Sequence, residues 1–236
     1  MDRYTLRARY YPVVILFFPI FILGIFYSFQ FESYIHALTS LGTVSAFTYL
    51  FSQLGRDQGK KKEKKLWESW GGTPSVQILR INNSHLDPHT KQRYHAKLQA
   101  LCPVETVPNA AMENADLLGA DQIYSAWTRF LIAQTRDTGK FALLFKDNTS
   151  YGFRRNLWGL KPHGICLVVM LFLGNYVYWA IILKDVNPVA YPTSFLYSTI
   201  ALFFYLIFWI VIVNKNWVKL IALAYAERLC ECSESL

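Results

Sequence analysis

Two stretches of the sequence combine positive charge with groups that can hold a phosphate. The first is a run of five lysines in six residues, from Lys60 to Lys65, which includes Lys61 and Lys62. Lysine ammonium groups bind phosphate oxygens by charge, so such a run suits a nucleotide or an oligonucleotide. It also suits anionic lipid, because basic residues collect on the inner side of a membrane. By itself, the lysine run favours anionic lipid over a nucleotide or an oligonucleotide as the binding partner.

The second stretch interleaves basic and aromatic residues between Tyr151 and Lys161. Arg154 and Arg155 can each grip a phosphate through two parallel hydrogen bonds, and the ring of Trp158 can stack on a base. Trp and Arg are also common at the depth of lipid headgroups, so a ligand site and a lipid anchor stay open as alternatives. Together the two stretches predict a positive collar for an anionic ligand. Its residues are Lys60, Lys61, Lys62, Arg154, Arg155, Trp158 and Lys161.

Three hydroxyl side chains form a third pattern. Ser45, Thr48 and Ser52 are spaced i, i+3 and i+7, which places them on one stripe of a helix. Small polar residues of this kind allow close packing between membrane helices, which is their commoner use, or they line a hydrated pore. If the protein is a channel, these three residues are the predicted pore lining.

No pattern predicts an enzyme, a cofactor or a metal site. The sequence has no Gly-x-Ser-x-Gly motif, and His85, His89 and His95 do not share one helical face. We therefore expect these histidines at the surface, without a metal. The string Gly55-x-x-x-Gly59-Lys60 differs from a phosphate-binding loop in its spacing and lacks the required Ser or Thr.

The composition places these residues in a membrane protein. Of the 236 residues 53% are hydrophobic and 17% are charged, whereas a soluble domain has about 25% charged residues. Most of the charge lies between long apolar runs, which excludes a disordered chain and a purely soluble one. Four runs are long enough to cross about 30 Å of hydrocarbon. They cover residues 11–30, 35–54, 164–183 and 193–213.

The distribution of Lys and Arg predicts the orientation. With the N-terminus inside, Arg3, Arg7, Arg9 and every other basic residue except Lys184 lie on the cytoplasmic side. We therefore expect both termini in the cytoplasm. The predicted fold class is an all-α membrane protein, with four transmembrane helices and a mostly helical cytosolic insert between the second and third. The predicted regions are a first pair of spans (1–54), a cytosolic domain (55–163), a second pair of spans (164–213) and a cytosolic amphipathic tail (214–236).

Within the insert, local signals predict several elements. Asp87-Pro88 is a good start for a helix that ends near residue 101, and Gly71-Gly72 is a good stop for a helix that precedes it. A second helix is expected over residues 114–135, with Gly119 as a candidate break within it, and a short strand over 75–80. After the last span, residues 215–229 predict an amphipathic helix.

The insert resembles that of a family of small bacterial membrane proteins. The resemblance rests on GRDQGKKKEKKLWESWGGTPS, DPHTKQRYH, TRDTGKFALLFKDNTSYGFRRN and LWGLKP, and it covers residues 55–162. In that family two spans, a cytosolic insert and two further spans follow in this order. The family is similar to the channel effectors of Hailong-type anti-phage defence operons, which are encoded beside a nucleotidyltransferase. The resemblance implies a non-enzymatic effector of the bacterial inner membrane, opened by an oligonucleotide signal, whose ion flow stops the growth of an infected cell.

A channel reading requires several copies of the chain. Four spans in one subunit do not comfortably enclose a hydrated pore, so we expect a homo-oligomer, with a tetramer favoured. The expected function is then an ion channel of antiviral defence that depolarises infected cells in response to a nucleotide or oligonucleotide. The alternative is a membrane-anchored scaffold that docks a nucleic-acid-handling partner protein through its basic face. Membrane lipid is a partner in both cases.

Overall fold

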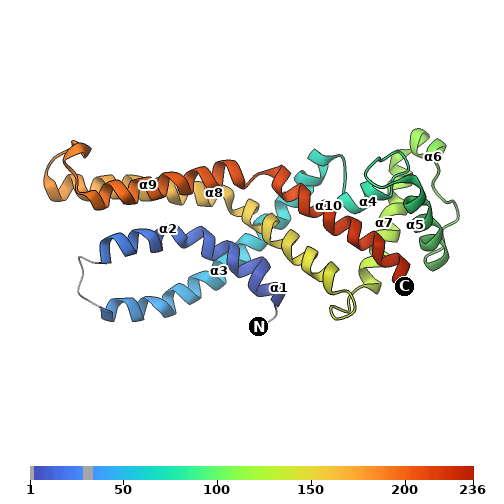
Figure 1. Cartoon of the computed structure of the whole chain (residues 1–236), viewed down its shortest axis with the longest axis horizontal. Helices are drawn as coiled ribbons and strands as arrows, with labels where there is room; N and C mark the ends of the chain where they lie inside the picture. Colours follow the sequence, from blue (N-terminus) through green and yellow to red (C-terminus); the bar gives the residue numbers. More distant parts are fainter. Residues whose placement is uncertain (1–2, 29–33) are drawn as a thin grey trace. The chain divides into compact units, whose positions relative to one another are not determined.

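The computed structural model describes residues 3–28 and 34–236, with the side chains of residues 3, 25, 28 and 34–48 left out. Over this part of the chain the structure is helical and contains no strand, which agrees with the predicted all-α class (Figure 1). The elements are α1 (Arg3–Thr5), the π-helical turn η1 (Leu6–Tyr10), α2 (Tyr11–Ser28), α3 (Tyr34–Trp70), α4 (Pro74–Leu79), α5 (Pro88–Leu101), α6 (Ala110–Ala115), α7 (Leu117–Gln134), α8 (Ala142–Leu183), the 3-10 turn η2 (Pro188–Ala190), α9 (Thr193–Ile207), the π-helical turn η3 (Phe208–Ile212), α10 (Lys215–Glu231) and the 3-10 turn η4 (Cys232–Ser235).

The chain divides into two compact units. Unit 1 consists of Met1–Lys62 and Gly152–Trp217, and unit 2 consists of Glu63–Tyr151 and Val218–Leu236. Three helices, α3, α8 and α10, begin in one unit and end in the other without an interruption. The unit boundaries differ from the region boundaries predicted from the sequence. Those regions separate membrane-spanning from cytosolic segments, and they remain predictions.

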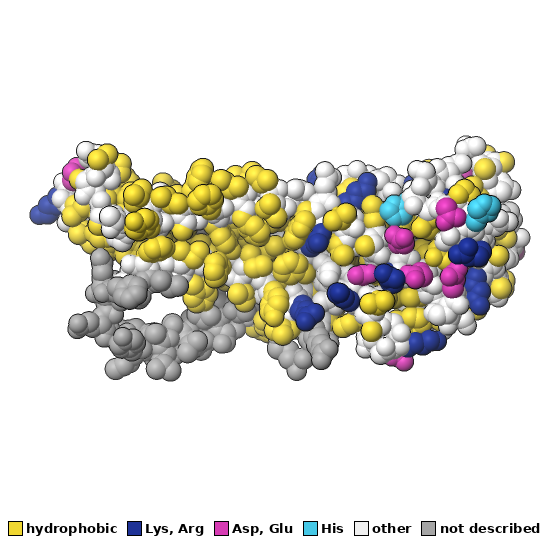
Figure 2. All heavy atoms as spheres, in the orientation of Figure 1, with side chains coloured by type: hydrophobic (Ala, Val, Ile, Leu, Met, Phe, Trp, Pro, Cys, Tyr) yellow, Lys and Arg dark blue, Asp and Glu magenta, His cyan; other side chains and the backbone are white. Residues whose placement is uncertain are grey.

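Unit 1 holds the apolar helices. Within the described part of the chain, three segments are long and apolar enough to cross a membrane: Leu6–Gly24, a window within Ala142–Leu183, and Thr193–Ile212. They overlap the first, third and fourth predicted spans, and hydrophobic side chains cover most of the visible surface of α9 (Figure 2). The second predicted span lies in α3, but most of its side chains are outside the described residues. The second span therefore remains a prediction.

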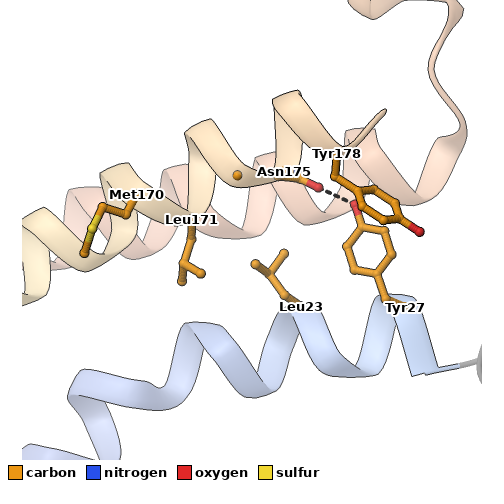
Figure 3. Close-up of a pocket in the computed structure, with 7 residues that line it drawn as sticks. Leu23, Tyr27, Met170, Leu171, Asn175 and Tyr178 are labelled. Atoms are coloured by element: carbon orange, nitrogen blue, oxygen red, sulfur yellow. Dashed lines mark hydrogen bonds between the residues drawn. The ribbon is translucent and has the colours of Figure 1, made fainter. Parts of the chain in front are cut away.

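A polar network links α2, α8 and α9 within this apolar surrounding. Figure 3 shows its bond between Tyr27 on α2 and Asn175 on α8. The Tyr27 hydroxyl donates to Asn175 Oδ1 and accepts from Trp179 Nε1 at 2.7 Å. The Asn175 amide donates to Ser198 Oγ at 3.0 Å and to Thr199 Oγ1 at 3.2 Å. Hydrogen bonds of this kind hold helices together where no water competes. Beside them lies an apolar cavity of about 300 Å³ between α2 and α8.

Unit 2 is a helical domain with its own core, built from α4, α5, α7 and α10. The fully buried side chains of Tyr124, Trp127 and Leu131 lie at its centre. The helix expected after Asp87 is confirmed, and Asp87 Oδ1 accepts from the Thr90 amide at 2.9 Å. The helix expected over residues 114–135 is confirmed as α7, which continues through Gly119. It begins at Leu117, because Asp116 follows the end of α6 and caps α7 through the Gly119 amide.

The strand predicted over residues 75–80 is wrong. Residues 75–79 belong to α4, which begins at Pro74, a favourable first residue for a helix, and Arg80 follows its end. All six side chains of α4 are buried. Its hydrophobic residues therefore do not distinguish a recurrence every second position, as in a strand, from one every third or fourth position, as in a surface helix.

Buried polar side chains form hydrogen bonds to the backbone of the segment that follows α4. Glu113, which is 4% exposed, accepts from the amides of Ile81 and Asn82 at 2.5 and 3.0 Å and from the Tyr124 hydroxyl at 2.6 Å. Lys91 donates to the carbonyl oxygens of Ile81 and Asn83. His95 is also buried, at 8% exposure, which corrects the expectation that it lies at the surface. Its Nε2 bonds the Leu79 carbonyl oxygen at 2.7 Å.

Burial of His95 makes the stability of unit 2 depend on pH. Desolvation lowers the pKa of His95 below its ordinary value of 6.5; the Lys91 charge adds to this, while the Leu79 bond and the Glu113 charge oppose it. The unfolded chain therefore binds more protons than the folded one, and stability is lost as the pH falls below 6.5. Thermal unfolding of the detergent-solubilised protein, followed by tryptophan fluorescence, should show a lower midpoint at pH 5 than at pH 7.

The variant His95→Gln, whose amide can still donate to the Leu79 oxygen, should flatten this pH dependence between pH 5 and 7. His89→Gln is the matched control, because His89 is exposed. An equal slope in wild type and His95→Gln would show that another group titrates.

Candidate functional site

The predicted basic collar lies where α3 and α8 touch within unit 1. At this point the two backbones are in contact: a Cβ atom placed on Gly159 would lie 2.6 Å from the Gly59 nitrogen and 2.9 Å from its Cα. A Cβ on Gly59 would lie 2.5 Å from Asn156 Oδ1. Glycine at both positions is what permits this approach, as in other close helix pairs. The string Gly55-x-x-x-Gly59 is therefore a small-residue packing motif.

Lys62 and Trp158, two of the predicted ligand residues, meet at this crossing. The Lys62 ammonium donates to the Gly159 carbonyl oxygen at 2.8 Å and lies 5.6 Å from the centre of the Trp158 ring. Partial burial lowers the pKa of Lys62. Lys62 on α3 is thus hydrogen-bonded to α8 at Gly159, the residue where the two backbones touch.

The two arginines are also engaged within the chain. Arg154 Nη1 donates to the Trp217 carbonyl oxygen at 2.8 Å, and its guanidinium lies 4.7 Å from the centre of the Trp217 ring. Arg155 is buried, and its Nε and Nη2 each lie 3.3 Å from Asn156 Oδ1. Asn156 in turn donates to the Ala8 carbonyl oxygen at 2.8 Å, within η1.

Lys161 binds the end of the η3 turn. Its ammonium donates to the carbonyl oxygens of Ile210 and Val213 at 3.0 and 2.8 Å. Carbonyl groups at the C-terminal end of a helix have no partner within the helix and carry partial negative charge. A lysine there satisfies both requirements without a ligand.

Lys60 and Lys61 differ from the rest of the predicted collar, because both are exposed. Lys64 and Lys65, further along α3, are exposed as well. All seven predicted residues thus lie on α3 or α8. Lys60 and Lys61 are the exposed pair next to the Gly59–Gly159 contact.

Asn156 and Gly159 are part of the site but are not among the residues predicted from the sequence. Both are buried on α8 and both touch α3 or η1. The signal that could have found them is the pair of small residues Gly55 and Gly59, which indicates that α3 packs closely against another helix.

The predicted pore stripe is described only at one residue. Ser45 and Thr48 belong to the segment whose side chains lie outside the described residues. Ser52 is 1% exposed within a single chain, and its hydroxyl donates to the Tyr49 carbonyl oxygen at 2.6 Å. A pore formed by several copies along this stripe remains a prediction.

The described part of the chain contains no group of three or more His, Cys, Asp or Glu side chains that could hold a metal ion. No known protein family, characterised protein or solved structure matches the chain. The arrangement of the site therefore carries the functional argument.

Proposed function

We propose that this protein is a multi-pass membrane channel that opens when an anionic nucleotide or oligonucleotide binds at Lys60 and Lys61. The single observation that carries the proposal is the position of these lysines. They are exposed, and they directly follow Gly59, whose backbone touches that of Gly159 on α8.

The connection from this contact to the spans is short. α3 contains the second predicted span and α8 contains the third, and each helix continues through the contact without a break. A ligand that binds more tightly to one arrangement of α3 against α8 shifts the population toward that arrangement. The lysines are thus placed to couple ligand binding to the position of two predicted membrane helices.

The wider setting is part of the same proposal. Assembly as a homo-oligomer, with a tetramer favoured, follows from the need for several copies around a pore. The positive-inside distribution supports an inner membrane with both termini in the cytoplasm. The role in antiviral defence, with a nucleotidyltransferase as the source of the signal, rests on the resemblance of the insert motifs.

The test is an ion-flux measurement on the purified protein in vesicles of neutral phosphatidylcholine, with linear and cyclic RNA tetranucleotides of random sequence as the probe. We expect the probe to start flux, and we expect the combined variant Lys60→Gln and Lys61→Gln to weaken this response at least about tenfold. Two charge contacts are lost, and the apparent affinity of the wild type should fall linearly with the logarithm of salt concentration.

The matched control is Lys60→Arg with Lys61→Arg, which keeps both charges and should keep the response. Tetranucleotide binding without flux would favour the scaffold instead of the channel. Flux that is insensitive to both lysines, together with weaker binding of the glutamine variant to anionic vesicles, would identify the lysines as a lipid anchor.

A further inference from the structure

A groove in unit 2 lies apart from the basic collar. It runs between α5 and the segment 102–109, and its volume is about 500 Å³, within the range of about 300–1,000 Å³ that is usual for small-molecule sites. The far wall is held in place, because the side-chain amide of Gln99 makes two hydrogen bonds to the backbone of Val104 and Trp127 Nε1 donates to the Cys102 carbonyl oxygen.

The groove is lined by both apolar and polar side chains. Pro88 and Ala96 on α5, and Val107 and Pro108 in the segment opposite, supply apolar surface that suits the faces of a planar ring. Lys91 and His95 are also part of the lining, one helical turn apart, and each is more than nine-tenths buried. Ligand sites commonly combine apolar walls with a few buried polar groups in this way.

His95 offers a hydrogen-bond acceptor. Its Nε2 lies 2.7 Å from the Leu79 carbonyl oxygen, and a carbonyl oxygen only accepts, so Nε2 carries the proton. Burial keeps the pKa of His95 low and the ring neutral, which leaves a lone pair on Nδ1. The ring cannot turn freely, because it packs against both Tyr124 and Trp127, with ring centres 5.5 and 5.4 Å away. No hydrogen bond to Nδ1 is found among the described residues.

Lys91 offers a donor. Its ammonium has three N–H groups, and two are used by the carbonyl oxygens of Ile81 and Asn83, so one is left. The carboxylate of Glu113 is close enough to act on the charges of both Lys91 and His95. Because a buried negative charge already balances that of Lys91, the lining suits a neutral polar ring better than a phosphate.

We propose that this groove binds a small planar lactam, a ring with an N–H group beside a C=O group, as in the bases of inosine, guanosine and uridine. The ring N–H donates to His95 Nδ1, and the adjacent carbonyl oxygen accepts from the free N–H of Lys91. The apolar walls cover the faces of the ring. The groove includes neither Lys60 nor Lys61, so this site is independent of the proposed channel.

The experiment titrates inosine and 1-methylinosine against the full-length protein in neutral phosphatidylcholine nanodiscs, with saturation-transfer difference NMR as the readout. The two nucleosides differ in the ring N–H, which the methyl group replaces. We expect inosine to bind and 1-methylinosine to bind at least about tenfold more weakly, because the buried acceptor on His95 then loses its partner.

Two variants of α5 locate the site without disturbing its buried polar residues. Ala96→Phe fills the groove from an exposed lining position and should remove inosine binding. Ala100→Phe makes the same change at an exposed residue of α5 outside the groove and should leave binding unchanged. Absence of inosine binding at millimolar concentration, equal binding of both nucleosides, or full binding by Ala96→Phe would each overturn the proposal.

Discussion

Replacement of Gly159 by alanine should separate α3 from α8 and destabilise unit 1 by about 1–3 kcal/mol or more. The added Cβ would lie 2.6 Å from the backbone nitrogen of Gly59, and a backbone atom cannot turn away as a side chain can. Relief requires the helices to move apart, which would also stretch the hydrogen bond from Lys62 to the Gly159 oxygen. The measurement is the midpoint of thermal unfolding of the detergent-solubilised protein, with size-exclusion chromatography used to quantify the folded fraction that remains after heating to each temperature.

Gly174→Ala is the matched control, because Gly174 lies on the same helix and nothing approaches its Cβ position within 4 Å. Alanine favours a helix over glycine by roughly 0.5–1 kcal/mol, so this variant should be as stable as the wild type or slightly more stable. Equal stability of Gly159→Ala and Gly174→Ala would mean that the backbones of α3 and α8 are not in contact in the protein.

Replacement of Glu113 by alanine should have the largest effect in unit 2. The change leaves the amides of Ile81 and Asn82 and the hydroxyl of Tyr124 without their acceptor. It also removes the larger of the two negative charges that act on the buried ammonium of Lys91, those of Glu113 and Asp87. Each unsatisfied buried group costs about 1–3 kcal/mol, so a loss of roughly 3 kcal/mol or more is expected. Urea unfolding followed by tryptophan fluorescence should show a much lower midpoint.

Glu105→Ala removes the same group from an exposed position and should change the midpoint little. A small effect of Glu113→Ala, comparable to that of Glu105→Ala, would show that water or another side chain replaces the carboxylate.

Much of the helical plan could be predicted from local signals in the sequence. The apolar runs define three of the predicted spans, and Asp87-Pro88 defines the start of α5, because hydrophobic length and helix capping are local properties. The error at α4 has a different origin. A short segment that is buried on every side has no polar face, so its sequence does not reveal its period.

The candidate site was harder to predict, because its contacts join residues far apart in the chain. The sequence indicated which side chains are basic, but it did not show that Arg154 faces the Trp217 carbonyl or that Lys161 faces the end of η3. The same limit applies to His95. Its burial depends on the partner carbonyl at Leu79, which belongs to a helix in a segment that the sequence predicts as a strand.

The donors on α8 also bear on how this helix can move. Asn156 bonds a carbonyl oxygen in the η1 turn, and Lys161 bonds two carbonyl oxygens at the end of η3. Such acceptors occur at fixed places along the neighbouring helices, and a helix repeats only every turn, about 5.4 Å along its axis. A gradual slide of α8 would break these bonds before new ones form. Displacement of α8 should therefore be stepwise, with an energy barrier between resting positions, and any activity that depends on it should switch between discrete levels.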